Sequence, residues 1–275
     1  MTDVLEYFEN SLIQHGKENN RVYLMKFGSD CAEKLVDHIE TLADKHNYTK
    51  IFTKIPATRA NLFLKRGYIQ EASIPKFFKG SEECLFLVKY LDESRKQADR
   101  QEIEVVISGS LAKKVGKKEP LNDEFALEEL NSSNAAEIAG LYRKVFPSYP
   151  FPIFEHGYIL KTMLDNVIYF GAKKDGKIIA LSSAEIDYDN LNVEMTDFAT
   201  NFEFRGRNLS LYLLQKMQEK MKELDIKTVY TIARSLSFGM NTTFARDNYE
   251  FGGMLINNTN ISGKIESMNV WYKSI

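Results

Sequence analysis

Two different periods of apolar residues predict where the strands and helices of this chain lie. Apolar and polar positions alternate within residues 193–200, which are rich in β-branched and aromatic side chains and predict a strand. After a short loop, apolar side chains recur three or four residues apart, at Leu214, Met217, Met221 and Leu224. That spacing predicts one face of an amphipathic helix. We expect the rest of the chain to be organised around this strand, loop and helix.

The N-terminal region, residues 1–91, shows the same two patterns. They predict strands and helices at 21–27, 31–46, 50–55, 57–66, 71–74 and 85–90. Pro56 stops the second strand, and Gly67 is a typical stop after a short helix. The expected order is strand, helix, strand, helix, strand, strand.

Composition changes between residues 92 and 122. This segment is dense in charge and poor in aromatic residues, apart from the apolar run Ile103 to Ile107. Such a composition is typical of a linker or a peripheral connection. We therefore divide the chain into an N-terminal region (1–91), a charged linker (92–122) and a C-terminal domain (123–275).

The C-terminal domain is predicted to hold more elements than the N-terminal region. Its patterns indicate a strand at 125–130, helices at 135–145 and 158–164, and a hairpin of 167–172 with 177–187. Asp175-Gly176 is a typical hairpin turn. After the central helix we expect a strand at 228–233, a helix at 241–247 and two strands within 253–271.

The two regions resemble each other. Residues 50–68 match 228–249 as strand, connection, short helix and aromatic residue. We interpret this as an internal duplication whose first copy lacks the Arg-Gly loop of the second. Chance similarity of two short β-α-β pieces is the alternative.

The loop before the central helix has the residue types of an anion-binding site. Gly206 permits an unusual backbone turn, Arg205 and Arg207 flank it, and a helix N-terminus with unpaired N–H groups follows. Phosphate is the anion that such a loop typically binds. An ordinary turn with two solvated arginines is the alternative.

Charge and composition exclude several classes of function. The formal net charge of −2 argues against a nucleic-acid or membrane-surface role, which needs a concentrated positive field. No apolar run approaches the ~20 residues that span a bilayer, and the acidic start differs from a signal peptide. Two cysteines and four scattered histidines predict neither a disulfide framework nor a metal site. We expect a cytoplasmic protein without a metal cofactor.

The order of elements from Phe125 onwards resembles the GNAT acetyltransferase superfamily. Its acetyl-CoA motif is Arg or Gln, two residues, Gly, one residue, then Gly or Ala. The six residues 205–210 correspond to it, and they depart from it at Asn208 and Ser210. Asn is one of the few residues other than Gly that tolerate a positive φ.

The C-terminal stretch 230–273 and the loop Tyr149 to Ile153 resemble the β-lysine N-acetyltransferases more specifically. So do three N-terminal segments, 50–52, 67–68 and 74–75, and the resemblance covers nearly the whole chain. It implies an α/β (α+β) fold of the GNAT type, with a mixed, mostly antiparallel sheet flanked by helices and a degenerate GNAT-like half at the N-terminus.

The resemblance also implies an activity. The family transfers acetyl from acetyl-CoA to the ε-amine of β-lysine, and the product is a compatible solute under salt stress. Lysine, ornithine or a polyamine are alternative acceptors, and a non-catalytic acyl-CoA-binding module is a second hypothesis. The expected partners are acetyl-CoA and a small amine, with no nucleic acid and no membrane. The oligomeric state is left open, a homodimer included.

Amine acetylation requires a base, and three carboxylates are candidates. Glu194 and Asp197 lie on the strand that leads into the loop, and the superfamily often places a base there. Strand alternation predicts that they point to opposite faces, so that one of them borders the acceptor. We favour Glu194 as the base, with Asp197 as the alternative. Glu185, on the preceding strand, is a third carboxylate that is expected to hold an ammonium group.

The resemblance assigns the remaining binding residues. Three residues are expected to pair with pantetheine through their backbone: Phe198, Ala199 and Thr200. Six are expected to hold the pyrophosphate: Arg205, Gly206, Arg207, Asn208, Leu209 and Ser210. Asn241 and Phe244 on the short helix are expected to contact the cofactor.

For the acceptor, we expect Arg234 to clamp a carboxylate, because strand ends line ligand crevices in α/β sheets. Tyr149 and Asn258 are further polar candidates. Ala245 stands where the superfamily places a tyrosine general acid, and Tyr249 is expected in the core. The proton donor is then Tyr149, Ser237 or solvent.

Overall fold

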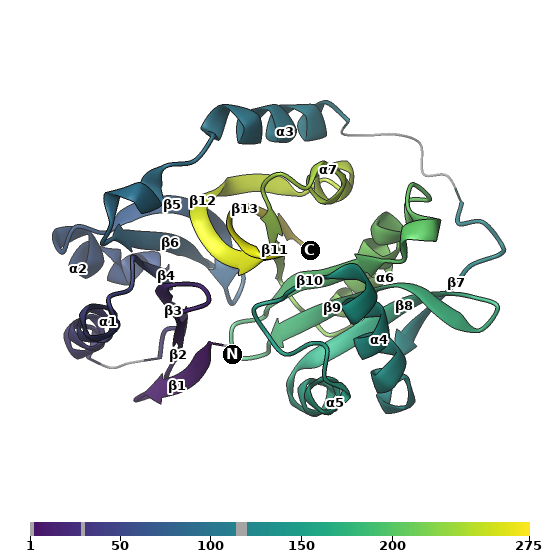
Figure 1. Ribbon diagram of the computed structural model, residues 1–275, viewed down its shortest axis with the longest axis horizontal. Helices are drawn as coiled ribbons and strands as arrows, with labels where there is room; N and C mark the ends of the chain where they lie inside the picture. The colour runs from purple at the N-terminus through teal and green to yellow at the C-terminus, as the bar shows by residue number, and fades with distance from the viewer. Residues whose placement is uncertain (1–2, 29–30, 114–119) are drawn as a thin grey trace.

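The computed structural model describes residues 3–28, 31–113 and 120–275. Within them, thirteen strands form one sheet in the order β1-β2-β3-β4-β6-β5-β12-β13-β11-β10-β9-β8-β7. In Figure 1 the N-terminal strands lie on the left, the C-terminal strands on the right, and β12 and β13 between them. The predicted mixed, mostly antiparallel sheet with flanking helices is confirmed, since among the described strands only β3–β4 and β10–β11 pair in parallel.

The described residues of the N-terminal half form six strands and two helices. They are β1 (Val4–Phe8), β2 (Ser11–Gly16), β3 (Arg21–Lys26), α1 (Ala32–His46), β4 (Lys50–Pro56), α2 (Ala60–Lys65), β5 (Ile69–Phe78) and β6 (Glu82–Tyr90). The sequence analysis missed β1 and β2. The residues of β1 are half-buried or exposed and show no apolar period, and β2 is mostly buried but contains polar residues at buried positions.

The C-terminal half contains seven strands and four helices. They are β7 (Ala126–Leu130), α4 (Ala135–Val145), α5 (His156–Asp165), β8 (Val167–Lys174), β9 (Lys177–Asp187), β10 (Asn192–Thr200), α6 (Leu209–Glu223), β11 (Thr228–Arg234), α7 (Phe238–Arg246), β12 (Glu250–Ile261) and β13 (Lys264–Ser274). Short 3-10 turns occur at Ala57–Arg59, Glu93–Lys96, Ser132–Asn134 and Phe202–Phe204.

The two halves repeat one arrangement. In each, a parallel pair of strands (β3 with β4, β10 with β11) is joined by a long helix, α1 or α6. In each, a short helix follows the second strand and leads to an antiparallel pair, β5–β6 or β12–β13. The pairs meet at the centre of the sheet, where Gly253 pairs with Ala72. The repeat predicted from residues 50–68 and 228–249 therefore extends to most of each half.

The predicted linker contains a helix that the sequence analysis did not predict, α3 (Arg100–Ala112). It runs across the top of the molecule from the N-terminal half to α7 (Figure 1). Asp99 caps it by accepting from the N–H of Glu102, and Ile103 and Ile107 are buried in the C-terminal core. The apolar run is thus the buried face of a helix. Residues 114–119 of the predicted linker lie outside the described part of the chain.

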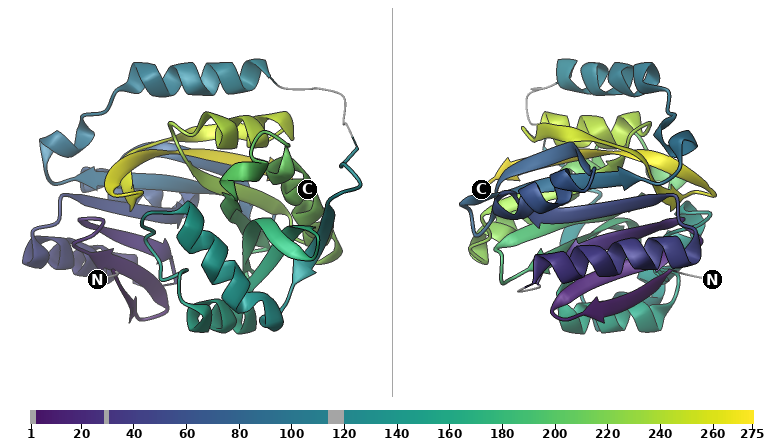
Figure 2. Two further views of the ribbon diagram at one scale, coloured as in Figure 1. Left: turned by 45° about the vertical axis from the view of Figure 1, so that its right-hand side comes forward. Right: turned by 90° about the vertical axis from the view of Figure 1, so that its left-hand side faces the viewer.

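The N-terminal sheet buries both faces. Helices α1 and α2 cover its outer face (Figure 2), where α1 contributes its apolar stripe Leu35, Val36, Ile39, Leu42 and Ala43. On the inner face, Tyr23 and Phe52 share a core cluster with Tyr230 of the C-terminal half. Because this inner face meets the C-terminal half, its residues are in a position to contribute to a site there.

Candidate active site

Strands β10 and β11 pair only where they begin. The paired positions are Asn192 with Thr228, Val193 with Val229 and Glu194 with Tyr230. Beyond these, β10 continues along β9 and β11 continues along β13, so the two strands separate. In the described chain, no strand fills the gap between their facing edges. Free backbone edges in such a gap can pair with an extended ligand as a strand would.

A cavity of about 660 Å³ opens in this gap. Residues of both separated strands line it: Thr196, Phe198 and Thr200 on β10, and Thr231, Ile232 and Ala233 on β11. Of the three residues predicted to pair with pantetheine, Phe198 and Thr200 line the cavity, whereas the side chain of Ala199 is buried in the core beneath α4 and α5.

A β-bulge places both predicted catalytic carboxylates in this cavity. The register of β10 against β9 shifts between Thr196 and Ala199, and Asp197 has a φ of 54°. A bulge interrupts the alternation of side chains between the two faces of a strand. Glu194 and Asp197 consequently line the same cavity. The prediction that they point to opposite faces assumed a regular strand, which the bulge interrupts. That only one of them borders the acceptor stays a prediction.

Glu194 lies among charged and hydroxyl groups from both halves. Burial raises its pKa to about 7, the charge of Lys54 opposes the rise, and Glu185 and Asp197 add to it. The Tyr230 hydroxyl lowers the pKa through a hydrogen bond. A carboxyl group with this pKa is about half ionised at neutral pH and exchanges protons readily there.

Asp197 is held differently, because hydroxyl groups surround it. It accepts hydrogen bonds from the hydroxyls of Tyr149, Ser183 (2.6 Å) and Thr196 (3.3 Å). Burial raises its pKa, and these three bonds oppose the rise. The carboxylate of Asp197 thereby orients Tyr149 at the cavity wall.

Glu185 stands directly across from Glu194 on β9. Glu185 faces the cavity, so solvent that enters the cavity reaches it, although the surrounding protein removes most of its hydration. Burial raises its pKa, and the charge of Lys54 lowers it. Two neighbouring carboxyl groups and one ammonium therefore share this part of the cavity.

The predicted phosphate loop lies at the other end of the cavity, which every residue from Phe204 to Ser210 lines. Gly206 has a φ of 79° and Asn208 a φ of 57°, so both adopt the left-handed conformation expected of them. Asn208 precedes α6, but its side chain does not cap the helix. Its side-chain oxygen instead accepts a hydrogen bond of 2.9 Å from Arg246. Since no side chain of the described residues caps α6, its N-terminal end can receive an anion.

The two arginines of the loop differ in their contacts. Arg207 donates to Glu124 at 3.0 Å, whereas the guanidinium of Arg205 lies 4.2 Å from the ring centroid of Phe202. Both arginines line the cavity. The loop is thus more than a turn with solvated cations, because its backbone and both flanking side chains border one cavity.

The prediction for Arg234 is corrected by the structure. Arg234 lines the cavity, but its Nε and Nη2 atoms each donate to Glu266 at 2.7 Å. Glu266 is buried, so this two-pronged ion pair already occupies the guanidinium. Arg234 is not a free clamp for a carboxylate.

Asn241 is also placed differently from the prediction. Its side chain is fully buried: the amide nitrogen donates to the carbonyls of Arg234, Ser235 and Ser237, and the oxygen accepts from Asn269 and Trp271. Asn241 therefore fixes the start of α7 and does not reach the cavity. Phe244, on the same helix, does line it.

The candidate proton donors are also located. Tyr249 is fully buried in the core, as expected, and Ala245 is fully buried there too. Tyr149 and Ser237 line the cavity, and so does the predicted acceptor residue Asn258. The hydroxyl of Tyr149 donates a hydrogen bond to Asp197. Burial next to that carboxylate raises the pKa of Tyr149 well above its ordinary value.

Sequence analysis missed the contribution of the N-terminal half to this cavity. Six residues on one face of β2, β3 and β4 line it: Gln14, Arg21, Tyr23, Met25, Phe52 and Lys54. Strand alternation was the available signal, since these residues alternate along the strands with apolar residues of the opposite face, which pack under α1. Polar residues on a strand face that is covered by other elements indicate a site.

The described residues contain no group of three or more His, Cys, Asp or Glu side chains placed to hold a metal ion. In the same part of the chain, no helix is long and apolar enough to cross a membrane.

Comparison with known proteins gives the class and then the family. The model described as "Acetyltransferase (GNAT) family" matches residues 136–240, which include the separated strand β10 and the phosphate loop. The chain is a GNAT acetyltransferase, as its resemblance to that superfamily predicted, and acetyl-CoA is its acyl donor.

Three curated proteins are similar over nearly their full length. The β-lysine N(6)-acetyltransferase of Methanococcus maripaludis is 40% identical over 274 residues, which cover 99% of each chain. N-acetyltransferase YodP of Bacillus subtilis is 30% identical, covering 96% of each. The β-lysine N(6)-acetyltransferase of Methanosarcina mazei is 29% identical, covering 88% of this chain and 97% of that one. The chain therefore belongs to the family of the β-lysine N-acetyltransferases.

Proposed function

We propose that this enzyme transfers the acetyl group of acetyl-CoA to the ε-amine of β-lysine (3,6-diaminohexanoate). Two of its relatives carry that activity in their names. The observation that carries the proposal is the position of Glu194, whose carboxyl group has a pKa of about 7 and faces the gap between β10 and β11. Acetyl-CoA and an amine can meet there beside a base suited to neutral pH.

We propose that the donor occupies the gap and the loop. The pyrophosphate binds the N-terminal end of α6 and the backbone from Gly206 to Ser210. Pantetheine extends along the free edge of β10 at Phe198 and Thr200, so that its backbone-like amides pair with the strand. The thioester then lies near the bulge at Asp197.

The proposed chemistry begins with the acceptor ammonium, which transfers a proton to Glu194. The free amine attacks the thioester carbon and forms a C–N bond, and collapse of the tetrahedral intermediate breaks the C–S bond. As the C–S bond breaks, the nitrogen loses its second proton and the leaving thiolate gains one. The Ser237 hydroxyl at the cavity wall is the candidate relay, which gives its proton to the thiolate and regains one from the nitrogen, while Glu194 returns the first proton to solvent. Asp197 acts by orienting Tyr149, and Glu185 attracts the ammonium of the acceptor.

The remaining expectations belong to this proposal. The product carries one positive and one negative charge and accumulates as a compatible solute, which gives the enzyme a role in adaptation to salt. We propose that it works in the cytoplasm, where acetyl-CoA is available. A homodimer is the oligomeric state to test first, by the molar mass in solution.

The experiment measures acetyl-CoA-dependent thiol release by the purified protein with β-lysine, α-lysine, ornithine and spermidine in parallel. We expect release with β-lysine at a kcat/KM well above that with the other amines. Comparable release with several amines would keep the enzyme class and remove β-lysine as the specific acceptor. Release with spermidine alone would contradict the proposal.

A further inference from the structure

Arg21 is a buried cation that forms no ion pair within the described part of the chain. Its exposed fraction is 4%, and it lies on β3 at the cavity wall. Its Nη1 atom donates to the carbonyl of Asn258 and, at 3.1 Å, to the hydroxyl of Thr259, and both acceptors are neutral. In the described chain, no carboxylate forms an ion pair with it. A buried charge of this kind is costly unless a counter-charge reaches it.

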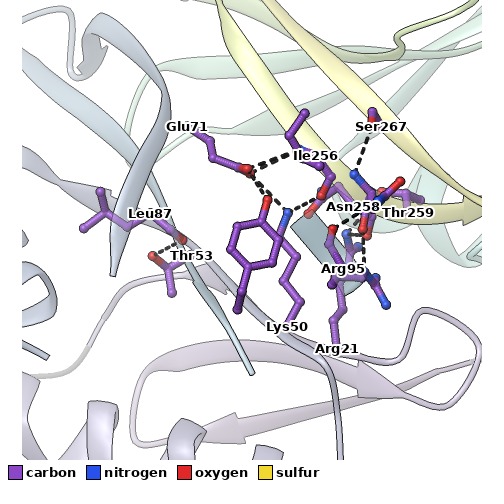
Figure 3. Close-up of polar contacts among 12 residues, drawn as sticks. Arg21, Lys50, Thr53, Glu71, Leu87, Arg95, Ile256, Asn258, Thr259 and Ser267 are labelled. Carbon is purple, nitrogen blue, oxygen red and sulfur yellow. Dashed lines mark hydrogen bonds and ion pairs between the residues drawn. The ribbon is translucent and has the colours of Figure 1, made fainter. Parts of the chain in front are cut away.

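Two neighbouring cations, Lys50 and Arg95, contact the same strand as Arg21, and among the three only Lys50 forms an ion pair in the described chain. Lys50, Arg95 and Arg21 each donate to one of three successive carbonyls of the irregular part of β12, at Ile256, Asn257 and Asn258 respectively (Figure 3). Lys50 also pairs with Glu71 at 3.1 Å.

Neither Lys50 nor Arg95 lines the cavity. All three cations thus bind β12 of the C-terminal half, and of the three only Arg21 lines the cavity. Burial lowers the pKa of Arg21 to about 10, because the charged form has lost its hydration.

Three unpaired polar atoms lie around this end of the cavity. They are Nε of Arg21, Oε1 of Gln14 and Oδ1 of Asn258, and none of the three finds a hydrogen-bond partner in the described chain. All three residues line the cavity and are at least nine-tenths buried. Buried polar atoms are rarely left unpaired in native structures, so a ligand is their natural partner. The set offers one charged donor and two neutral acceptors.

We propose that Arg21 binds the carboxylate of the amino-acid acceptor, while Gln14 and Asn258 accept hydrogen bonds from the amine beside it. This inference rests on the proposed function, because it needs an acceptor that carries both groups at one end. A carboxylate fits the guanidinium of Arg21, and an ammonium supplies donors for both amide oxygens. The N-terminal half then recognises the end of the acceptor that does not react.

The position of Tyr23 supports this arrangement. The guanidinium of Arg21 lies 5.0 Å from the ring centroid of Tyr23, and the Lys54 ammonium lies 5.6 Å from it. The charges of both Arg21 and Glu194 act on the Tyr23 hydroxyl, so Tyr23 is near the base as well. An extended β-lysine measures roughly 8 Å from its ε-nitrogen to its carboxylate, by ordinary bond lengths. A β-lysine bound with its ε-amine at Glu194 would extend past Tyr23 towards Arg21.

The test compares two acceptors in steady-state kinetics, β-lysine and 1,4-diaminopentane, which is β-lysine with its carboxylate replaced by hydrogen. Arg21→Gln is expected to raise the KM for β-lysine roughly 10- to 100-fold, which is typical of a lost charge-assisted hydrogen bond. Its kcat/KM for the diamine is expected to stay within about twofold of the wild-type value, because the diamine makes no contact with Arg21. Arg21→Lys, which keeps the charge, is expected to give an intermediate KM.

Arg95→Gln is the matched control, because it removes a buried arginine from the same cluster without touching the cavity. It is expected to change the kinetics with both acceptors by the same factor. If Arg21→Gln also changes both acceptors equally, or leaves the KM for β-lysine unchanged, the role of Arg21 is overturned. Failure of the proposed function is a separate result: the wild-type enzyme would then not acetylate β-lysine.

Discussion

The ammonium of Lys54 donates a hydrogen bond of 3.1 Å to the hydroxyl of Tyr230. Lys54 comes from the N-terminal half, and Tyr230 pairs with Glu194 across the start of β10 and β11. The same hydroxyl acts on the carboxylate of Glu194. The N-terminal half therefore reaches the proposed base directly, and its charge helps to set the pKa of that base.

The first prediction concerns the pH dependence of catalysis. We expect kcat/KM to rise with pH around a pKa of about 7, because Glu194 must be ionised to accept a proton. Glu194→Gln is expected to lower kcat by roughly 10²- to 10⁴-fold and to abolish this rise. The measurements are pH–rate profiles of both proteins and acetyl-CoA binding by calorimetry. A variant that retains the wild-type kcat would exclude Glu194 as the base.

The second prediction concerns stability. Burial raises the pKa of Glu194 from an ordinary 4.5 to about 7, so the folded protein retains a proton that the unfolded chain releases between these values. The free energy of unfolding therefore falls as pH rises through this window, by an amount on the order of 3 kcal/mol above it. Glu194→Gln removes this cost. We expect the variant to exceed the wild type in stability at pH 8 and to match it at pH 4, as measured by urea unfolding.

The third prediction concerns Lys54. The charge of Lys54 lowers the pKa of Glu194. Lys54→Met is therefore expected to shift the acidic limb of the pH–rate profile to higher pH, by about one pH unit or more. Activity should fall at pH 7 and recover at pH 9. Lys89→Met is the control, since Lys89 pairs with Glu40 in the same half, away from the cavity. An unshifted profile for Lys54→Met would show that the N-terminal half does not tune the base.

The fourth prediction concerns the phosphate loop. Gly206 has a φ of 79° and no atom near the position of an added Cβ, so Gly206→Ala introduces backbone strain of about 1 kcal/mol without a clash. We expect a several-fold higher KM for acetyl-CoA, since the strain shifts the N–H groups of the loop. Gly140→Ala is the matched control: Gly140 lies within α4, also with open space, and alanine there favours the helix. An unchanged KM for acetyl-CoA in Gly206→Ala would show that this loop does not bind the donor.

The fifth prediction concerns Arg234. Arg234→Gln leaves the buried carboxylate of Glu266 without its two hydrogen bonds and is expected to lower the free energy of unfolding by about 1–3 kcal/mol. The double variant Arg234→Gln/Glu266→Gln is expected to regain part of this loss, because no buried charge is left unpaired. Chemical denaturation of the two single variants and the double variant gives the interaction energy. Additive losses would show that the pair contributes nothing.

The local features of the site were accessible from sequence, because each depends on neighbouring residues. The left-handed conformations at Gly206 and Asn208 and the start of α6 follow from residue types at fixed spacing. The position of Glu194 on the strand before the loop follows in the same way. Even the repeat of the two halves was visible in the short match between residues 50–68 and 228–249.

What only the tertiary structure decided depends on contacts between distant segments. The bulge that turns Asp197 towards Glu194 is a matter of register against β9. The engagement of Arg234 by Glu266 requires the pairing of β11 with β13.

The face of β2, β3 and β4 that completes the cavity becomes a wall only because the N-terminal sheet packs against the C-terminal half. The sequence thus determined which residues form strands, helices and an anion loop, since these depend on local periodicity and backbone preference. It did not determine which charges find partners within the protein and which remain for a ligand, because that requires the packing of the whole chain.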